Sequence, residues 1–479
     1  MAHRFKRNLH SQCGRYGALP TTRREMLQRA GLGFGSLALA GLVAREGLGK
    51  SGALGSSPTG HLTHFSPRAR NVIFLFMGGG PSQIDTFDPK PELSRLDGKE
   101  TPESIRKLFQ RTATMGNGTR KLMGSPFRFQ RYGESGLPVS DLLPGIARHI
   151  DDLCIVRSMQ HDTSIHMPGE YIMTTGTIVG NRPSLGAWVT YGLGSESHDL
   201  PEYIVFGGPT RPTYSAGFLP ARHQGTSITS GEIPHLELPW GVSTTGRRRQ
   251  LDFIGRMNQM HRQRVDSGNT ELEARIRSYE LAFRMQLAAP EAFDLNQETA
   301  ATKRLYGVGE NPTNDVGTQC LMARRLVERG VRFIQLYVGG WDSHSDLKGG
   351  HQGCADRSDR PIAGLLTDLK QRGLLDSTLL VWGGEFGRTP GAEKGNGRDH
   401  SPGGFTVWLA GGGVKGGQVI GKTDPVGYTA IERPIHPNSL HATILHALGL
   451  EQEKLTFRHN GRDEIPTFVS SELVHEVFA

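Results

Sequence analysis

The sequence predicts an α/β protein in which a mostly parallel β-sheet lies between two layers of helices. Two observations carry this prediction: short continuous apolar runs that end near glycines, and amphipathic helical segments between these runs. An apolar run without polar alternation is typical of a strand that is buried on both faces. Strands that alternate with helices are typical of a parallel sheet covered on both sides.

The predicted strands are short apolar runs, and the first leads directly into a glycine turn. This turn is Gly78-Gly79-Gly80-Pro81. Glycine permits the backbone turns and close approaches that such strand ends require. The five predicted strands are, in chain order, residues 71–77, 153–157, 331–338, 378–382 and 405–409.

Helices are predicted between these strands from apolar residues that recur with the 3.6-residue period. Residues 317–329 are predicted to be helical and to stop at Gly330. Pro361 is predicted to open the next helix, because proline is tolerated in a first helical turn, and Gly373 to end it. The apolar faces are Ile362, Leu365, Leu366 and Leu369 in that helix and Leu440, Ile444 and Leu448 in a third.

Residues 69–479 are predicted to form one α/β domain, with a helical insertion at 246–305. The segment before it, 45–68, is rich in Gly, Ser, Pro and Thr and is predicted to be a flexible linker. The insertion is predicted from an apolar stripe at spacings of three and four residues. The stripe consists of Leu272, Ile276, Tyr279, Phe283 and Leu287.

The positive charge of the chain is concentrated at its N-terminus. The 479 residues have a formal net charge of +8, from 55 Lys and Arg against 47 Asp and Glu. Residues 1–50 contain nine Lys or Arg and two acidic residues, so the remainder has a net charge of only +1. Without a basic surface on the remainder, we expect no nucleic-acid partner.

Residues 1–44 have the layout of a twin-arginine export signal. Arg23-Arg24 precedes an uncharged run of small and apolar residues at 30–44. The alternative is an amphipathic or buried N-terminal helix. The signal predicts recognition by the twin-arginine machinery, cleavage near Ala44 and a periplasmic or extracellular location. The run is too short to span a hydrocarbon core of about 30 Å, so no membrane span is expected in the mature chain.

Three cysteines, Cys154, Cys320 and Cys354, follow the signal. They allow one disulfide and one remaining thiol, and the sequence does not select the pair. None lies in a Cys-x-x-Cys motif, which argues against a cysteine-based zinc site.

Acidic residues and histidines follow several predicted strands. Parallel strands place their carboxyl ends at one edge of a sheet, so these side chains are expected to meet there. Carboxylate oxygens together with neutral imidazoles favour zinc, manganese or iron over calcium or a metal selected by thiolates, with zinc or manganese expected first. Each aspartate on its own can also be a helix cap or a hydrogen-bonding group of a loop. The predicted metal ligands are Asp85, Asp342, His344, Glu385, Asp399 and His400.

A metal ion beside an arginine can neutralise the charge on a phosphoryl or sulfuryl oxygen. We expect Arg388 to contact the anionic group of a substrate, with an ion pair to Glu385 or Glu393 as the alternative. His161 and His166 are candidates for a nucleophile, a general acid or a metal ligand, and each can equally be a structural histidine.

Several motifs together resemble a bacterial exported family known as "domain of unknown function 1501", in its planctomycete branch. This family belongs to the alkaline phosphatase and sulfatase superfamily, so the resemblance implies that fold. The motifs are the twin-arginine signal, residues 79–90 (GGPSQIDTFDPK), 182–188 (RPSLGAW), 278–282 (SYELA), 340–344 (GWDSH), 384–390 (GEFGRTP) and 397–400 (GRDH).

The site differs from that of ordinary sulfatases. Their first strand ends in two metal-binding aspartates, whereas Gly78 and Gly79 occupy these places here. Their nucleophile motif is Cys/Ser-x-Pro-x-Arg, and the corresponding segment here begins with His166. The hypothesis is an exported, metal-dependent hydrolase with a rebuilt site, acting on a phosphate or sulfate ester of a polysaccharide or lipid. Its catalytic residues would be His166, Thr163 or Ser164, with Arg388; the alternative is a non-catalytic binding or assembly protein of the cell envelope.

Overall fold

The computed structural model describes residues 63–109, 121–197, 199–208, 211–228, 243–264 and 291–478. The predicted export signal, residues 45–62 of the predicted linker and the apolar stripe between Leu272 and Leu287 lie outside the described residues. No helix in the described part of the chain is both long enough and hydrophobic enough to span a bilayer.

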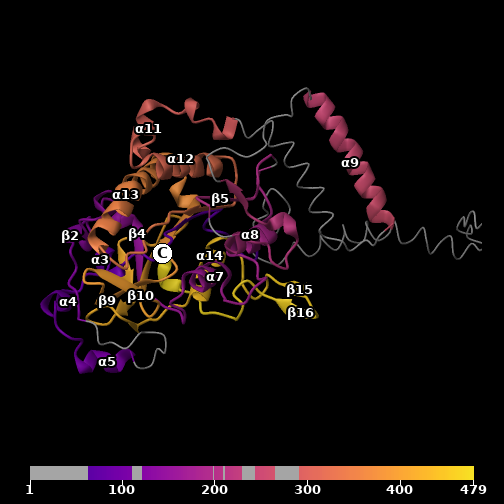
Figure 1. The fold of residues 1–479 in the computed structure, drawn as a ribbon. Coiled ribbons are helices and arrows are strands. Elements are labelled where there is room, and N and C mark those ends of the chain that lie inside the picture. Colours follow the sequence, from indigo (N-terminus) through magenta and orange to yellow (C-terminus); the bar gives the residue numbers. More distant parts are fainter. Residues whose placement is uncertain are drawn as a thin grey trace, which may run out of the picture. The chain divides into compact units, whose positions relative to one another are not determined.

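A central sheet of eight strands organises the protein (Figure 1), in the order β12-β4-β11-β8-β1-β7-β5-β6. Every neighbouring pair is parallel except the two that involve β11, which runs antiparallel to β4 and β8. The predicted mostly parallel sheet is therefore confirmed. The strands are β1 (Asn71–Phe76), β4 (Leu153–Met159), β5 (Tyr203–Phe206), β6 (Thr226–Ile228), β7 (Phe333–Tyr337), β8 (Thr378–Gly383), β11 (Phe405–Ala410) and β12 (Gln418–Ile420).

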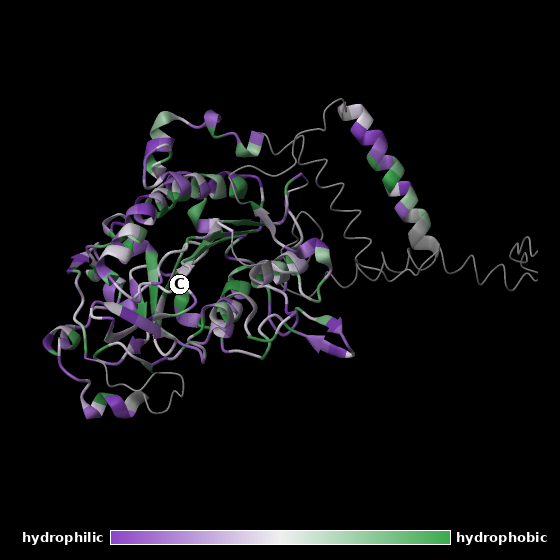
Figure 2. Cartoon of the chain, in the orientation of Figure 1, coloured by the Kyte–Doolittle hydropathy of each residue, from purple (hydrophilic) through white to green (hydrophobic). Residues whose placement is uncertain are grey.

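Helices cover both faces of the sheet (Figure 1). One hydrophobic cluster joins the sheet to α12 (Asn314–Glu328) and α13 (Leu347–Gln371). A second joins the opposite face to α7 (His166–Thr175), α8 (Leu185–Leu193) and α14 (Pro437–Ala447). In Figure 2 the central strands are largely hydrophobic, as expected for a sheet covered on both sides.

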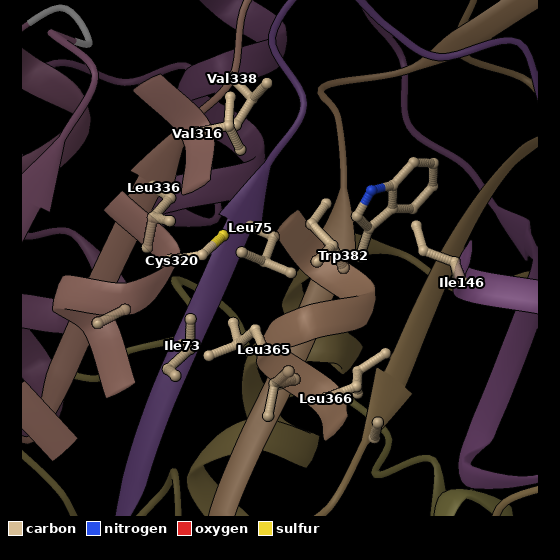
Figure 3. Close-up of a cluster of buried hydrophobic side chains, with 14 of the residues drawn as sticks. Ile73, Leu75, Ile146, Val316, Cys320, Leu336, Val338, Leu365, Leu366 and Trp382 are labelled. Atoms are coloured by element: carbon tan, nitrogen blue, oxygen red, sulfur yellow. The ribbon is translucent and has the colours of Figure 1, made fainter. Parts of the chain in front are cut away.

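Strand β1 shows how an unbroken apolar run serves both layers. Ile73 and Leu75 belong to the cluster with α12 and α13, whereas Phe74 belongs to the cluster on the other face. Figure 3 shows Leu365 of α13 against the β1 side chains. Successive strand residues point to opposite faces, so a strand with two covered faces needs apolar residues at every position.

Smaller elements complete the described part. The helices are α3 (Gln83–Thr86), α4 (Pro91–Arg95), α5 (Glu103–Phe109), α6 (Pro144–Ala147), α9 (Thr244–Arg264) and α11 (Ala300–Tyr306). The strands are β2 (Phe129–Tyr132), β3 (Leu137–Ser140), β9 (Gly387–Glu393), β10 (Gly397–Ser401), β13 (Lys422–Thr423), β14 (Ala430–Glu432), β15 (Phe457–His459) and β16 (Arg462–Glu464).

The prediction that Pro361 opens a helix is wrong, because α13 passes through it from Leu347 to Gln371. A proline inside a helix removes one backbone hydrogen bond. Here residues on both sides of Pro361 are buried in one cluster, Cys354 before it and Leu365 after it. This shared packing outweighs the local cost, and Gly373 follows the helix in the left-handed region, with φ 66°.

The β9–β10 hairpin was not predicted from the sequence. Its connection contains Lys394 at φ 45° and Gly395 at φ 90°, and the pairing has a bulge between Arg398 and His400. Bulges redirect side chains. The hairpin follows β8 and precedes β11, so it lies at the edge of the sheet where β8 ends and β11 begins.

Two further features concern the chain outside the sheet. The last residues of the predicted linker are attached to the end of α14: the amides of His64 and Arg68 donate to the carbonyls of Gly449 and Ala447, both at 2.8 Å. Cys154, Cys320 and Cys354 are buried free thiols, so no disulfide joins them.

Candidate metal centre

Four loops meet at the carboxyl edge of the sheet. They follow β1, β4, β7 and β8, which run in one direction, and the β9–β10 hairpin closes over them. Close packing requires glycines here: a Cβ on Gly397 would lie 2.0 Å from the carbonyl oxygen of His344, and one on Gly79 would lie 2.5 Å from the amide of Asp342. Ligand sites of open α/β sheets lie at this edge.

Three histidines surround one carboxylate in this region. Nε2 of His344 and Nε2 of His400 each lie 3.1 Å from Oδ1 of Asp342, and they lie 2.9 Å from each other. Nε2 of His166 lies 3.2 Å from Oδ2 of the same carboxylate. One ligand atom from each of these four residues lies within 4.8 Å of all the others. We call these four residues the histidine cluster.

Each histidine of the cluster is held by its other ring nitrogen. Nδ1 of His166 contacts Oε1 of Glu385, and Nδ1 of His344 contacts Oε2 of Glu393, both at 2.6 Å. Nδ1 of His400 lies 2.6 Å from the backbone carbonyl oxygen of Ser164. Metal-binding histidines commonly donate their second N–H to a carboxylate or carbonyl in this way, which fixes the ring and its tautomer.

The three acceptors at Nδ1 determine whether each Nε2 atom, which faces Asp342, carries a proton or a lone pair. A neutral imidazole that donates from Nδ1 has only a lone pair at Nε2. His344 and His400 then direct two lone pairs at each other and at Oδ1 of Asp342, and Nε2 of His166 directs a third at Oδ2 of the same carboxylate. Three lone pairs and a carboxylate facing one point require a positive charge, either an extra proton or a metal ion.

The electrostatics of the cluster agree with this requirement. Partial burial would raise the pKa of Asp342, but His166, His400 and Arg388 hold it well below its usual range. Burial would lower the pKa of His166, but the carboxylates of Asp342 and Glu385 outweigh burial and raise it to about 9. Without a metal ion, a proton on His166 therefore supplies the positive charge.

The helix that carries His166 is positioned by local sequence. Pro168 lies in the first turn of α7, where its missing N–H is not needed, and Gly176 ends the helix at φ 80°. Gly169 lets α7 approach Glu385, since a Cβ there would lie 3.2 Å from the Cβ of Glu385. The ring of Phe386 stacks on His400 at 4.5 Å between centroids and forms an apolar wall beside the cluster.

Arg388 does not occupy the predicted position against a substrate anion, and this expectation is corrected. Its side chain is fully buried. Its guanidinium donates to the carbonyls of Gly79 and Gly80 and, at 2.6 Å, to Oδ1 of Asp342. A guanidinium so enclosed cannot touch a ligand from solution, so Arg388 positions Asp342.

Asp85 is not brought into the histidine cluster. It is fully buried, and its carboxylate accepts hydrogen bonds from Arg398 at 2.8 Å and from the hydroxyl of Ser82 at 2.5 Å. The Asp85–Arg398 pair joins α3 to β10. With both partners fully buried, this carboxylate is neutralised by an arginine and does not face the three histidines.

The remaining predicted residues lie around the cluster. Glu385 is fully buried; its Oε1 accepts from the amide of Gly79 at 2.9 Å as well as contacting His166. Asp399 accepts from the amide of His400 at 2.9 Å, and its Oδ1 lies 4.0 Å from Nδ1 of His344. Thr163 Oγ1 accepts from the amide of Ile165. Burial lowers the pKa of His161 to about 4, which keeps the ring neutral near pH 7, and its Nε2 contacts the backbone carbonyl of Glu385.

Sequence reasoning missed two neighbours of the histidine cluster, Glu393 and Phe386. Glu393 was considered only as a partner of Arg388. It ends β9, immediately before the Lys394-Gly395-Asn396 turn, and that turn was the available signal for the hairpin. His166 is predicted to be a nucleophile, a general acid or a metal ligand, and the structure places it among the candidate ligands.

Several solved structures are similar to the chain at low identity. They include an alkaline phosphatase from the Antarctic bacterium TAB5 (10% identity, 81% of this chain and 99% of that chain, TM-score 0.35). Others are the lipoteichoic acid synthase LtaP from Listeria monocytogenes (8%, 83% and 76%, TM-score 0.32) and the PsFucS1 sulfatase from Pseudoalteromonas sp. (13%, 81% and 69%, TM-score 0.33). At these TM-scores the similarity assigns no activity.

No curated protein matches the chain. The planctomycete origin stays a prediction. A family model described as "Protein of unknown function (DUF1501)" matches residues 69–478, which include every residue of the histidine cluster, and the chain therefore belongs to this family.

Proposed function

We propose that the protein is an exported hydrolase of phosphate or sulfate esters that binds a divalent metal ion in the histidine cluster. The observation that carries this proposal is the arrangement of His166, His344 and His400 around Asp342, each imidazole being held at Nδ1 by a separate acceptor. Export rests on the twin-arginine pattern at Arg23-Arg24 and would place the enzyme in the periplasm or outside the cell.

The residues fit a metal ion of the zinc or manganese type. Three imidazole nitrogens and one carboxylate oxygen are ligands that such ions accept, and no cysteine belongs to the group of candidate ligands among the described residues. Glu385, Glu393 and the carbonyl of Ser164 would orient the three rings, while Arg388 fixes Asp342. A bound divalent ion would supply charge neutralisation at an ester oxygen and a lowered pKa for bound water.

The open side of the cluster is where a substrate would approach. The side chain of Asp342 is 42% exposed and that of His166 is 34% exposed, whereas Glu385 and Arg388 behind them are fully buried. Ser164 lies beside His400, and its hydroxyl forms no hydrogen bond within the described part of the chain. We assign Ser164 as the hydroxyl candidate for the nucleophile, with Thr163 less available because Ile165 already donates to its oxygen.

The first test is elemental analysis of protein purified after folded export. We expect a stoichiometric divalent metal in the wild type and its loss in Asp342→Ala and His400→Ala. Gln130→Ala, an exposed change on β2, is the control that must retain the metal. A metal-free wild type that is folded, and unchanged in stability by the two cluster variants, would refute the proposal.

The second test separates the hydrolase from a non-catalytic protein of the cell envelope. A panel of phosphate and sulfate esters is assayed with added zinc or manganese, in the wild type and in His166→Ala and Ser164→Ala. Turnover that is abolished by His166→Ala excludes the non-catalytic alternative. Stoichiometric metal without turnover of any ester would favour that alternative, in which the ion is structural.

A further inference from the structure

Helix α9 exposes three large apolar side chains on one face. Phe253, Met257 and Met260 are 58%, 51% and 50% exposed, and Figure 2 shows hydrophobic and hydrophilic residues alternating along this helix. The three side chains follow each other at spacings of four and three residues, so they lie on the same side of the helix. Leu251 projects from nearly the opposite side and is only 3% exposed. The helix therefore has one packed side and one exposed apolar face, Phe253-Met257-Met260, which we call the α9 face.

Two arginines border the α9 face. Arg249 precedes Phe253 by four residues and Arg256 precedes Met260 by four residues, so each lies one helical turn from an exposed apolar side chain. Both arginines are exposed, and neither forms an ion pair with another described residue. The aliphatic stem of an arginine can extend along an apolar surface while its guanidinium stays in a polar layer.

Positive charge is concentrated in this helix. Residues 244–264 contain six arginines and one aspartate, a net charge of +5. The chain after residue 50 has a net charge of +1, so its residues outside the helix carry a net charge of −4. The aspartate, Asp252, is already paired with Arg248 at 2.7 Å. An anionic surface would therefore attract the protein through α9 and repel the rest of the chain.

The apolar face and the arginines together indicate which kind of surface fits α9. A soluble polyanion would pair with the arginines but leave Phe253 and the two methionines in water. An uncharged apolar groove would cover the α9 face but leave the arginines unpaired. A bilayer with anionic headgroups matches both features, because apolar side chains enter the acyl boundary while arginines contact the headgroups. The arginines make a span across the hydrocarbon core too costly, so the helix would lie in the plane of the surface.

We propose that α9 binds the surface of an anionic membrane and attaches the exported protein to it as a peripheral protein. The occupant of the α9 face is then the lipid bilayer itself. This inference goes beyond the proposed function, since no residue of α9 belongs to the histidine cluster. Attachment to a membrane would hold whether or not the cluster binds a metal ion.

The test is cosedimentation of the full exported chain with lipid vesicles. One set of vesicles contains phosphatidylcholine alone, and the other contains equal parts of phosphatidylcholine and phosphatidylglycerol. We expect the mixed vesicles to bind the protein at least about tenfold more tightly, and added salt to weaken this binding, because the arginines interact with anionic headgroups.

Two combined variants separate the apolar from the electrostatic contribution. The apolar variant, Phe253→Ser with Met257→Ser and Met260→Ser, should bind mixed vesicles about tenfold or more weakly, because the buried apolar area is lost. The arginine variant, Arg249→Gln with Arg256→Gln, should bind them about 25-fold more weakly, since each arginine near an anionic surface contributes about a factor of five.

Matched controls change the same kinds of side chain elsewhere. Ile431→Ser with Val469→Ser removes two apolar side chains that are 47% and 53% exposed. Arg95→Gln with Arg458→Gln removes two exposed positive charges. Both controls should retain wild-type binding to mixed vesicles. Thermal melting shows that each variant is folded.

The inference is overturned if neither kind of vesicle binds, if binding survives both α9 variants, or if neutral vesicles bind as tightly as mixed ones. Three further results would overturn it by assigning the α9 face to another occupant. A dimer in solution that dissociates in the apolar variant, without vesicle binding, would assign it to a second copy of the chain. Binding of dextran sulfate without vesicle binding would assign the arginines to a soluble polyanion. A lower melting temperature of the apolar variant, without vesicle binding by the wild type, would show that another part of the same chain covers the face.

Discussion

The loops that follow β1 and β7 make an instructive comparison, because each brings an aspartate to the same edge of the sheet and each aspartate meets an arginine of the β9–β10 hairpin. Asp85 is fully buried, and Arg398 contacts both of its oxygens, at 2.8 and 3.4 Å. Asp342 is 42% exposed, and Arg388 contacts only Oδ1, at 2.6 Å. The second oxygen of Asp342 faces His166.

The difference shows what makes a carboxylate available to a ligand. Arg398 saturates Asp85 from within the protein, so Asp85 becomes a structural element. Arg388 leaves one oxygen of Asp342 unused and approaches from the buried side, so three histidines can gather on the open side. One arginine completes an ion pair, and the other orients a potential ligand. The predictions below test this distinction.

The largest effect is expected from breaking the buried pair. Arg398→Ala leaves Asp85 charged and uncompensated in the interior, which should lower the free energy of unfolding by about 3–5 kcal/mol. Urea unfolding measures this loss. Arg95→Ala, which breaks the exposed pair with Glu92, is the control and should cause no measurable change. Equal effects in the two variants would contradict the structural role assigned to Asp85.

A second prediction contrasts the cluster with a histidine buried on the α7 side of the sheet. Burial lowers the pKa of His441 from 6.5 to about 4, and its Nε2 donates to the carbonyl of Met173 at 2.8 Å. The unfolded chain binds a proton at His441 more readily than the folded chain does. The contribution of neutral His441 to the free energy of unfolding is therefore fully present above pH 6.5 and is lost as the pH falls from 6.5 to 4. The loss should reach about 3 kcal/mol from this group.

Urea unfolding between pH 4 and pH 7 measures this loss. His441→Gln keeps a donor for Met173 and cannot titrate, so its stability should depend less on pH than that of the wild type. The same pH dependence in both proteins would show that His441 is not responsible.

The fold was largely predictable because apolar runs and glycines are local signals. Strands β1, β4, β7, β8 and β11 all occur where the apolar runs predicted them. The different roles of Asp85 and Asp342 could not be predicted from the sequence. They depend on which arginine of the β9–β10 hairpin contacts which carboxylate, and this hairpin was not predicted. The prediction that a helix begins at Pro361 was wrong for a related reason. The packing of distant residues, and not the local preference of proline, decides where α13 begins.

The third prediction concerns the residues that orient the histidines. Glu385→Gln and Glu393→Gln should each weaken metal binding about 10- to 100-fold, because the glutamine amide is a weaker acceptor for Nδ1 of His166 or His344. Competition with a chelator measures the change. Glu310→Gln, at an exposed ion pair with Arg360, is the matched control and should retain wild-type affinity. Unchanged metal affinity in both variants would show that Glu385 and Glu393 do not orient the histidine rings for metal binding.

The smallest effect is expected at Asp399, and it decides how many ions the edge of the sheet holds. His344, Glu393 and Asp399 form a second group of candidate ligands that shares His344 with the histidine cluster. Nδ1 of His344 is 2.6 Å from Glu393 and 4.0 Å from Asp399, so this nitrogen is already engaged as a donor and cannot also bind a metal ion. Asp399→Asn should therefore keep one ion per chain and lower its affinity less than about tenfold, the lower limit for a group that orients a ligand directly. Metal analysis with chelator titration measures both quantities. If the wild type holds two ions and Asp399→Asn loses one, Glu393 and Asp399 themselves bind a metal ion. The histidine cluster would then be one of two neighbouring metal sites.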